Sequence, residues 1–148
     1  YHWQVKPLRI GNKLYVRSAQ KGGPLVCFEM KTHKVLWSKS YDDRVLSDPV
    51  LIDSWLYIIT ARNDMFDVLY LHRISPETGE SSLRAELVQV RDGLPAIGRP
   101  AVVGDGIFFR ASGALVNCNL RGAVQWARRL LFVPPDALPG MHGGMGLD

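Results

Sequence analysis

Long hydrophobic runs are absent from this 148-residue sequence. The longest apolar runs, such as residues 55–61, are far shorter than the roughly 20 residues that a membrane-spanning helix requires, so we predict no membrane span. Helical patterning is also absent, because prolines and glycines interrupt every window long enough to show a sustained 3.6-residue period. The sequence therefore predicts an all-β protein.

A secretory signal is not visible either. Residues 1–4 lack the charged segment, apolar core and small-residue cleavage site of a signal peptide. Because the chain begins without methionine, we expect a mature product or an excised fragment, whose original targeting signal could be missing. Hydrophobic content of 47% with 22% charged residues is typical of a folded chain and excludes a disordered one.

Cysteine is scarce. Cys27 and Cys118 could form a disulfide only if their Cα atoms lie within about 7 Å of each other. The repeat described below separates them by two repeat units, which favours two buried free thiols and leaves the redox compartment open. Their spacing also fits no common zinc pattern, so we predict no metal site.

Clustered charge is missing as well. The formal net charge is +4, but lysines and arginines are spread along the chain. The densest pair, Arg128 and Arg129, precedes the apolar residues 130–132 instead of extending a basic run. This distribution favours a solvated surface over a nucleic-acid site, because phosphate binding needs a basic patch or stripe.

What the sequence does contain is an internal repeat. Three segments run from proline to an aromatic residue in the same number of steps, and their prolines lie 42 and 51 residues apart: Pro7–Tyr15, Pro49–Tyr57 and Pro100–Phe108. Each consists of two short β-rich runs around a two-residue turn, which predicts a tight hairpin. The spacing is typical of four-stranded propeller blades.

Each unit continues with a third run, a turn and a fourth run. The third runs are residues 25–29, 68–74 and 114–118. The fourth runs carry Trp37, Leu83 and Trp126, and each of these residues follows its turn by four positions. We therefore predict three four-stranded blades at residues 5–45, 46–95 and 96–132, and a Pro/Gly-rich linker or tail at 133–148.

The turn motif, Thr-Gly followed by three residues and Trp, resembles the PQQ-like (quinoprotein-type, BamB-like) β-propeller repeat. Its three imperfect copies are residues 32–37, 78–83 and 121–126. The resemblance implies that Trp37 and Trp126 dock neighbouring blades, with Leu83 filling the same position less fully. It also implies that the outer turn is ordered by the remaining motif residues, Thr32, Thr78, Gly79 and Gly122.

The family contains both quinoprotein dehydrogenases and cofactor-free relatives. The dehydrogenases carry a catalytic Asp, a Ca²⁺ cage and often an adjacent cysteine pair, whereas this sequence has no adjacent cysteines and no matching acidic constellation. We therefore expect a non-catalytic protein-interaction scaffold without a cofactor. The alternative is a fragment of a PQQ-dependent dehydrogenase whose catalytic residues lie elsewhere.

Other candidate sites are weak. Residues 63–67 could suggest a calcium loop but lack its central Gly and final Glu, so we predict a solvated hairpin loop. The four histidines, His2, His33, His72 and His142, lie in no nucleophile motif, and we expect no catalytic triad. Met141, His142 and Met145 could attract copper, but a linker fits their surroundings better.

Three blades are too few for a closed propeller, which typically needs four to eight. We expect a protein partner or additional blades, supplied by missing sequence, by other chains or by an oligomer that completes the ring. The predicted binding surfaces are the loops at residues 19–23, 61–67 and 112–113. The resemblance implies a periplasmic, outer-membrane-associated or secreted protein.

Overall fold

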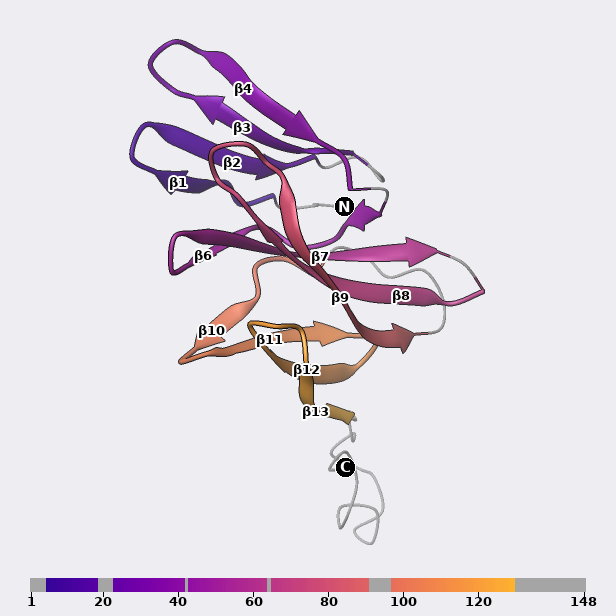
Figure 1. Cartoon of the computed structure of the whole chain (residues 1–148). Helices are drawn as coiled ribbons and strands as arrows, with labels where there is room; N and C mark the ends of the chain where they lie inside the picture. Colours follow the sequence, from indigo (N-terminus) through magenta and orange to yellow (C-terminus); the bar gives the residue numbers. More distant parts are fainter. Residues whose placement is uncertain (1–4, 19–22, 42, 64, 91–96, 130–148) are drawn as a thin grey trace, which may run out of the picture.

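The computed structural model describes residues 5–18, 23–41, 43–63, 65–90 and 97–129. These residues form thirteen strands and no helix, which confirms the all-β prediction. The strands build three antiparallel sheets, which follow one another in chain order from the top to the bottom of Figure 1. Within these ranges, no helix could cross a membrane.

The first and third sheets share one topology, in which each strand pairs with the next along the chain. The first sheet contains β1 (Leu8–Ile10), β2 (Lys13–Arg17), β3 (Leu25–Glu29) and β4 (Lys34–Lys39). The third contains β10 (Ala101–Val103), β11 (Gly106–Ala111), β12 (Ala114–Asn119) and β13 (Val124–Arg129). These strands coincide with the runs that the repeat predicts.

The second sheet has one additional strand. It repeats the pattern with β6 (Val50–Ile52), β7 (Trp55–Asn63), β8 (Asp67–Ile74) and β9 (Ser81–Val90). The extra strand β5 (Arg44–Val45) pairs with the far half of β7. Sequence patterning did not predict β5, since two residues show no periodicity. Its residues close the predicted first blade in sequence but belong to the second sheet in space.

Tight turns join the first two strands of each sheet, as predicted. Asp53 and Ser54 have φ of 50° and 68°, the two positive values of a type I′ turn, whose twist matches that of paired strands. Gly11 and Gly104 begin the other two turns, each with φ of 59°. The resulting register places one aromatic residue at the same position of each second strand: Tyr15, Tyr57 and Phe108.

A β-bulge recurs between the third and fourth strands of every sheet. The register shifts directly after Cys27, Arg73 and Asn117. These three residues pair with Trp37, Leu83 and Trp126, respectively. A bulge bends its strand and redirects the side chains beside it. The structure therefore holds the three motif residues at one equivalent position.

The hydrophobic core lies between the sheets. One cluster joins the first and second sheets, and the other joins the second and third. Strand β7 contributes to both, because Leu56 and Ile58 belong to the first cluster and Tyr57 and Ile59 to the second. A strand covered on both faces reads as a continuous apolar run, which accounts for the apolar residues 55–61.

The loop predicted over residues 63–67 is shorter than expected. Asn63 and Asp67 pair within the β7–β8 ladder, and Asp67 is fully buried, so the prediction of a solvated loop is wrong for Asp67, whereas Asn63 is exposed. The amide of Asn63 donates to the Asp67 carboxylate at 2.8 Å, which extends the hairpin through its side chains. Met65 and Phe66 are exposed at the tip.

Candidate functional site

The first and second sheets meet where β4 contacts the turn at residues 75–80. Trp37 Nε1 donates a hydrogen bond to the carbonyl oxygen of Pro76 at 2.9 Å, and the Tyr15 hydroxyl donates to the same oxygen at 3.1 Å. The centroids of the two rings are 5.9 Å apart. A carbonyl oxygen has two lone pairs and can accept both bonds. We call the contact of a fourth strand with the next sheet's turn a joint.

Gly79 allows the Trp37 ring to approach the backbone of this turn. A Cβ atom at Gly79 would lie 2.6 Å from the ring and 2.7 Å from Cγ of Lys39, closer than real Cβ contacts. Gly79 also has φ of 77°, a conformation that L residues rarely adopt. Both the backbone and the available space therefore require glycine at this position.

Polar contacts extend the first joint on both sides. The Tyr41 hydroxyl donates to the Gly79 carbonyl oxygen at 2.8 Å, and Lys39 Nζ pairs with Glu80 at 2.6 Å. Deeper inside, Arg17 Nε pairs with Asp48 at 2.9 Å, with both side chains at least 96% buried. Arg17 is thus an exception to the predicted solvated basic surface, and loss of either partner would leave a buried charge.

The second joint repeats this geometry with smaller residues. Gly122, with φ of 81°, is buried, and a Cβ there would lie 2.3 Å from Cβ of Ala85. Ala85 follows Leu83 by two positions, as Lys39 follows Trp37. The glycine of the turn therefore packs on the equivalent strand position in both joints, and Ala85 carries this contact in the second.

Gly122→Ala is expected to lower the free energy of unfolding by about 2 kcal/mol more than Gly11→Ala. Both substitutions place an L residue at positive φ, but Gly11 has no atom within 4 Å of the new Cβ, whereas Gly122 has Ala85. Urea unfolding of the two variants measures the difference. Equal losses would show that the turn does not pack against β9.

In the third sheet, Trp126 lies at the position that Trp37 occupies in the first sheet, but within the described ranges no further sheet follows. The Trp126 and Phe108 rings are 5.8 Å apart, as Trp37 and Tyr15 are in the first sheet, and the Arg128 guanidinium lies 5.4 Å from the Trp126 ring centroid. Trp126 is 36% exposed and Val103 is 68% exposed. Within the described ranges no sheet follows β13 (Figure 1), so this face has no covering turn from another sheet.

The opposite end of the stack shows an uncovered turn. His33 occupies the position that Gly79 and Gly122 occupy in the other sheets, and it has φ of 59°. Its side chain is exposed and stacks on Phe28 with 6.5 Å between ring centroids. The two motif threonines also serve their turns: Thr32 donates to Glu29 at 2.6 Å, and Thr78 accepts from the Glu80 amide at 3.2 Å.

Comparisons with known proteins agree with this repeated geometry. Among the similar solved structures is BamB from Moraxella catarrhalis, with a TM-score of 0.53 and 16% identity over 80% of this chain. Another is the quinohemoprotein alcohol dehydrogenase ADHIIG from Pseudomonas putida HK5, with a TM-score of 0.63 and 14% identity over 83% of this chain. The chain has the fold of a partial β-propeller. No protein-family model and no curated protein matches the sequence.

The three sheets are therefore blades 1, 2 and 3 of an unclosed propeller. The chain spans 34% of the length of the BamB chain and 26% of the dehydrogenase chain. At these identities the likeness shows the fold alone, and the resemblance inferred from the turn motif is confirmed at that level. The docking roles of the motif residues stay a prediction.

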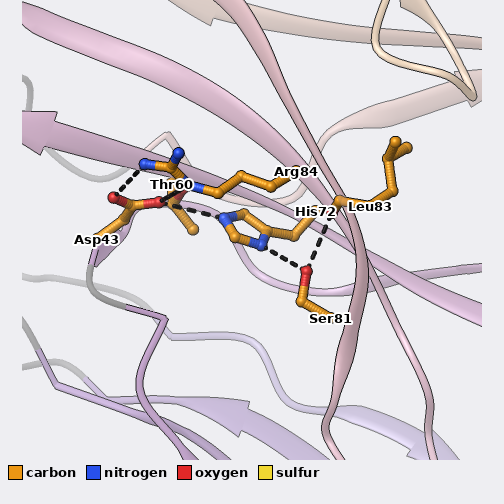
Figure 2. A network of polar contacts seen from close by, with 6 residues as sticks. All are labelled: Asp43, Thr60, His72, Ser81, Leu83 and Arg84. Carbon is orange, nitrogen blue, oxygen red and sulfur yellow. Dashed lines mark hydrogen bonds and ion pairs between the residues drawn. The ribbon is translucent and has the colours of Figure 1, made fainter.

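A buried polar network crosses blade 2 on the side that faces blade 1 (Figure 2). Its centre is Asp43, which lies just before β5. The Asp43 carboxylate accepts two hydrogen bonds from Arg84, both at 2.9 Å, and one each from Thr60 and His72, both at 3.2 Å. One carboxylate thus connects the segment between the blades to β7, β8 and β9.

The protonation states in this network follow from its contacts. Burial alone would raise the pKa of Asp43, but the hydrogen bonds from Arg84 and His72 outweigh burial and hold the pKa below its usual value. Burial lowers the pKa of His72, and the attraction of Asp43 offsets only part of that effect. Asp43 is therefore a carboxylate and His72 a neutral imidazole at neutral pH.

The tautomer of His72 decides where the Ser81 hydroxyl points. With Nε2 donating to Asp43, the other nitrogen of the neutral ring is bare and accepts from Ser81 at 2.9 Å. Ser81 Oγ is also 3.0 Å from the Leu83 carbonyl oxygen, but its single proton serves one acceptor. If His72 were protonated, its Nδ1 would donate to Ser81 Oγ. The Ser81 hydroxyl would then donate to the Leu83 carbonyl oxygen.

Ser81, His72 and Asp43 are the residue types of a hydrolase triad, although no nucleophile motif predicted one. In a hydrolase the serine contacts Nε2 and the aspartate contacts Nδ1. Here the two nitrogens have exchanged partners, and Arg84 already neutralises the carboxylate. The arrangement suits a structural crosslink better than a nucleophile.

The sequence contained a partial signal for this network. Thr60 and His72 directly follow the apolar runs at residues 55–59 and 68–71, and both are at least 98% buried. Asp43, Ser81 and Arg84 lie in polar segments, where a residue that becomes buried does not stand out. Burial of a polar side chain requires a hydrogen-bond partner, so Thr60 and His72 could have been predicted to share one.

A hollow of about 520 Å³ lies between blades 2 and 3. Three hairpin turns line it, with Ile52, Asp53, Gly104, Asp105, Asn119, Leu120 and Arg121. The predicted binding loop at residues 112–113 follows the opposite end of β11. The hollow is therefore not formed by that loop.

The remaining sequence predictions have mixed outcomes. Cys27 and Cys118 are buried and free, as expected. Among the residues that the structure describes, no group of three His, Cys, Asp or Glu side chains could hold a metal ion. Residues 19–22 of the predicted loop and the whole predicted tail at 133–148 lie outside the described residues, as do His2, Met141, His142 and Met145.

Proposed function

We propose that this chain is a non-catalytic interaction scaffold within a larger propeller, and that blade 3 docks a further blade. One observation carries the proposal: Trp126 has the register and aromatic neighbour of Trp37 but stays exposed at the end of the described stack. An aromatic side chain offers 150–250 Å² for burial, enough to dominate a contact between sheets.

The repeated joints support the same proposal. Their residues are occupied in packing sheets together: Trp37 and Tyr15 share the Pro76 carbonyl, and Gly79 and Gly122 are buried against the preceding blade. In the Asp43 network the acidic and imidazole groups bond one another instead of facing a cavity. We propose that this segment provides docking surfaces of a propeller and holds no reaction centre.

The competing proposal is a segment of a PQQ-dependent dehydrogenase, which the similarity to ADHIIG favours. Titrating the chain with PQQ and Ca²⁺ distinguishes the two. A scaffold is expected to leave the absorption spectrum of PQQ unchanged and to give no dye-linked oxidation of an alcohol. A bound chromophore at 1:1 stoichiometry would overturn the non-catalytic proposal.

By the same fold resemblance we propose a periplasmic, outer-membrane-associated or secreted location. Fractionation of the source cells, with an antibody against this chain, tests it. Recovery in the cytosolic fraction alone would contradict it.

A further inference from the structure

We infer that the exposed face of blade 3, around Trp126 and Arg128, docks a propeller blade whose outer turn carries glycine followed by an acidic residue, and not blade 1 of a second copy. This inference rests on the proposed docking function and adds the chemistry of the partner. It follows from three equivalent positions that the described joints define.

The first position is the glycine of the incoming turn. In both described joints this residue is buried against the preceding blade, and a Cβ would lie 2.6 Å from Trp37 at Gly79 and 2.3 Å from Ala85 at Gly122. Blade 1 has His33 at this position. Its side chain would collide with the Trp126 strand, so the blade 1 turn does not fit the blade 3 face.

The second and third positions are a pair of facing side chains. Lys39 lies two residues after Trp37, and it pairs with Glu80, which directly follows the turn glycine. In the second joint the equivalent residues are Ala85 and Ala123, which are both small and uncharged. Each pair is therefore matched in charge across its joint.

At the two free ends of the stack, the residues at these two positions carry the same charge. Arg128 occupies the Lys39 position on blade 3, because Arg128 pairs with Leu115 as Lys39 pairs with Leu25. The blade 1 turn offers Lys34 directly after His33. A second copy docked head to tail would bring two cations together, whereas a glutamate in the Glu80 position would attract Arg128.

The binding test uses a probe made from the full chain. His33→Gly with Lys34→Glu gives its blade 1 the Thr-Gly-Glu turn of residues 78–80, and Trp126→Ala with Arg128→Glu blocks its own docking face. Sedimentation velocity at low salt is expected to show a 1:1 complex of this probe with the wild-type chain. The same probe with His33 and Lys34 retained is expected to give no complex.

Exchanging the charges at positions 128 and 34 tests the contribution of the acidic residue alone. The Arg128→Glu chain is expected to bind the His33→Gly probe that retains Lys34, and to bind the Lys34→Glu probe about tenfold more weakly. Equal binding of both probes would overturn the inference about charge. Head-to-tail complexes of the wild-type chain with itself, as tight as those with the probe, would overturn the exclusion of a second copy.

The two proposals fail separately. If Trp126→Ala in the wild-type chain leaves probe binding unchanged, the face is not a docking surface and the proposed function fails with it. If Trp126→Ala abolishes binding while the glycine and charge variants have no effect, docking stands and only the partner chemistry is wrong. Thermal unfolding of each variant, compared with that of the wild type, identifies loss of folding as a cause.

Discussion

Asp43→Ala is expected to lower the free energy of unfolding by about 3–4 kcal/mol. The substitution leaves four donor groups on three residues without their acceptor, and two of these residues, His72 and Thr60, are buried. Removing one partner of a buried polar network costs its full desolvation penalty, about 1–3 kcal/mol for each stranded group. Arg84 is 38% exposed, so water replaces part of its contact and its contribution is smaller.

Glu80→Ala provides the matched control. Glu80 also accepts a charged donor, Lys39, but it is 69% exposed. Its loss is expected to change the free energy of unfolding by less than about 1 kcal/mol. Urea unfolding of both variants at pH 7.5 gives the comparison. Similar effects at the two positions would show that the Asp43 network is not the crosslink described above.

The network also predicts the direction of pH dependence. The pKa of His72 is lower in the folded chain than its ordinary value of 6.5, so the unfolded chain takes up the proton first. Stability is therefore expected to fall as the pH drops below about 6.5, by at most about 1.4 kcal/mol per pH unit from this group. The pKa of Asp43 is also lowered, so its contribution is lost only in more acidic solution.

His72→Gln isolates the histidine contribution. The variant is expected to lose less stability than the wild type between pH 7.5 and 5, whatever its stability at pH 7.5. Unfolding curves at several pH values measure both slopes. A steeper fall in the variant would contradict a lowered pKa for His72.

Trp37→Ala is expected to lower the free energy of unfolding by about 3 kcal/mol. The change removes the indole that packs on Gly79 and Tyr15 and the hydrogen bond to the Pro76 carbonyl. Tyr15 still satisfies that carbonyl, which keeps the cost below that of stranding a buried acceptor. Because the joint is lost, hydrogen exchange is expected to rise in β1–β4 before it rises in β10–β13.

Trp126→Ala is the control for this prediction. It removes the same side chain from the equivalent position, but Trp126 is exposed and contacts no further blade in the described stack. The expected loss in the isolated chain is about 1 kcal/mol, mostly from its contact with Phe108. A larger effect at Trp126 than at Trp37 would mean that the open and closed joints have been assigned the wrong way round.

Much of the fold could be predicted because each repeat carries local signals. The positive φ values at Asp53 and Ser54 correspond to a two-residue turn between β-rich runs, which the sequence displays directly. The spacing from turn to tryptophan also set the correct register for Trp37, Leu83 and Trp126. These signals lie within about ten residues of each other, where patterning is informative.

The candidate site depended on contacts between segments far apart in the sequence. Asp43 meets Arg84 across 41 residues, and Trp37 meets Pro76 across 39. Local patterning cannot show which acidic residue is buried, and Asp67 appeared to belong to a solvated loop for the same reason. The docking interpretation of Trp37 came from the family resemblance, whereas the Asp43 network had no such guide.

One joint is closed at Trp37, and its equivalent is open at Trp126. Hydrogen exchange of the indole N–H groups tests this difference, with NMR signals assigned by single Trp→Phe variants. The Trp37 proton, bonded to the Pro76 carbonyl, is expected to exchange at least tenfold more slowly than the Trp126 proton. Equal protection of the two, or slower exchange at Trp126, would contradict an open joint at Trp126.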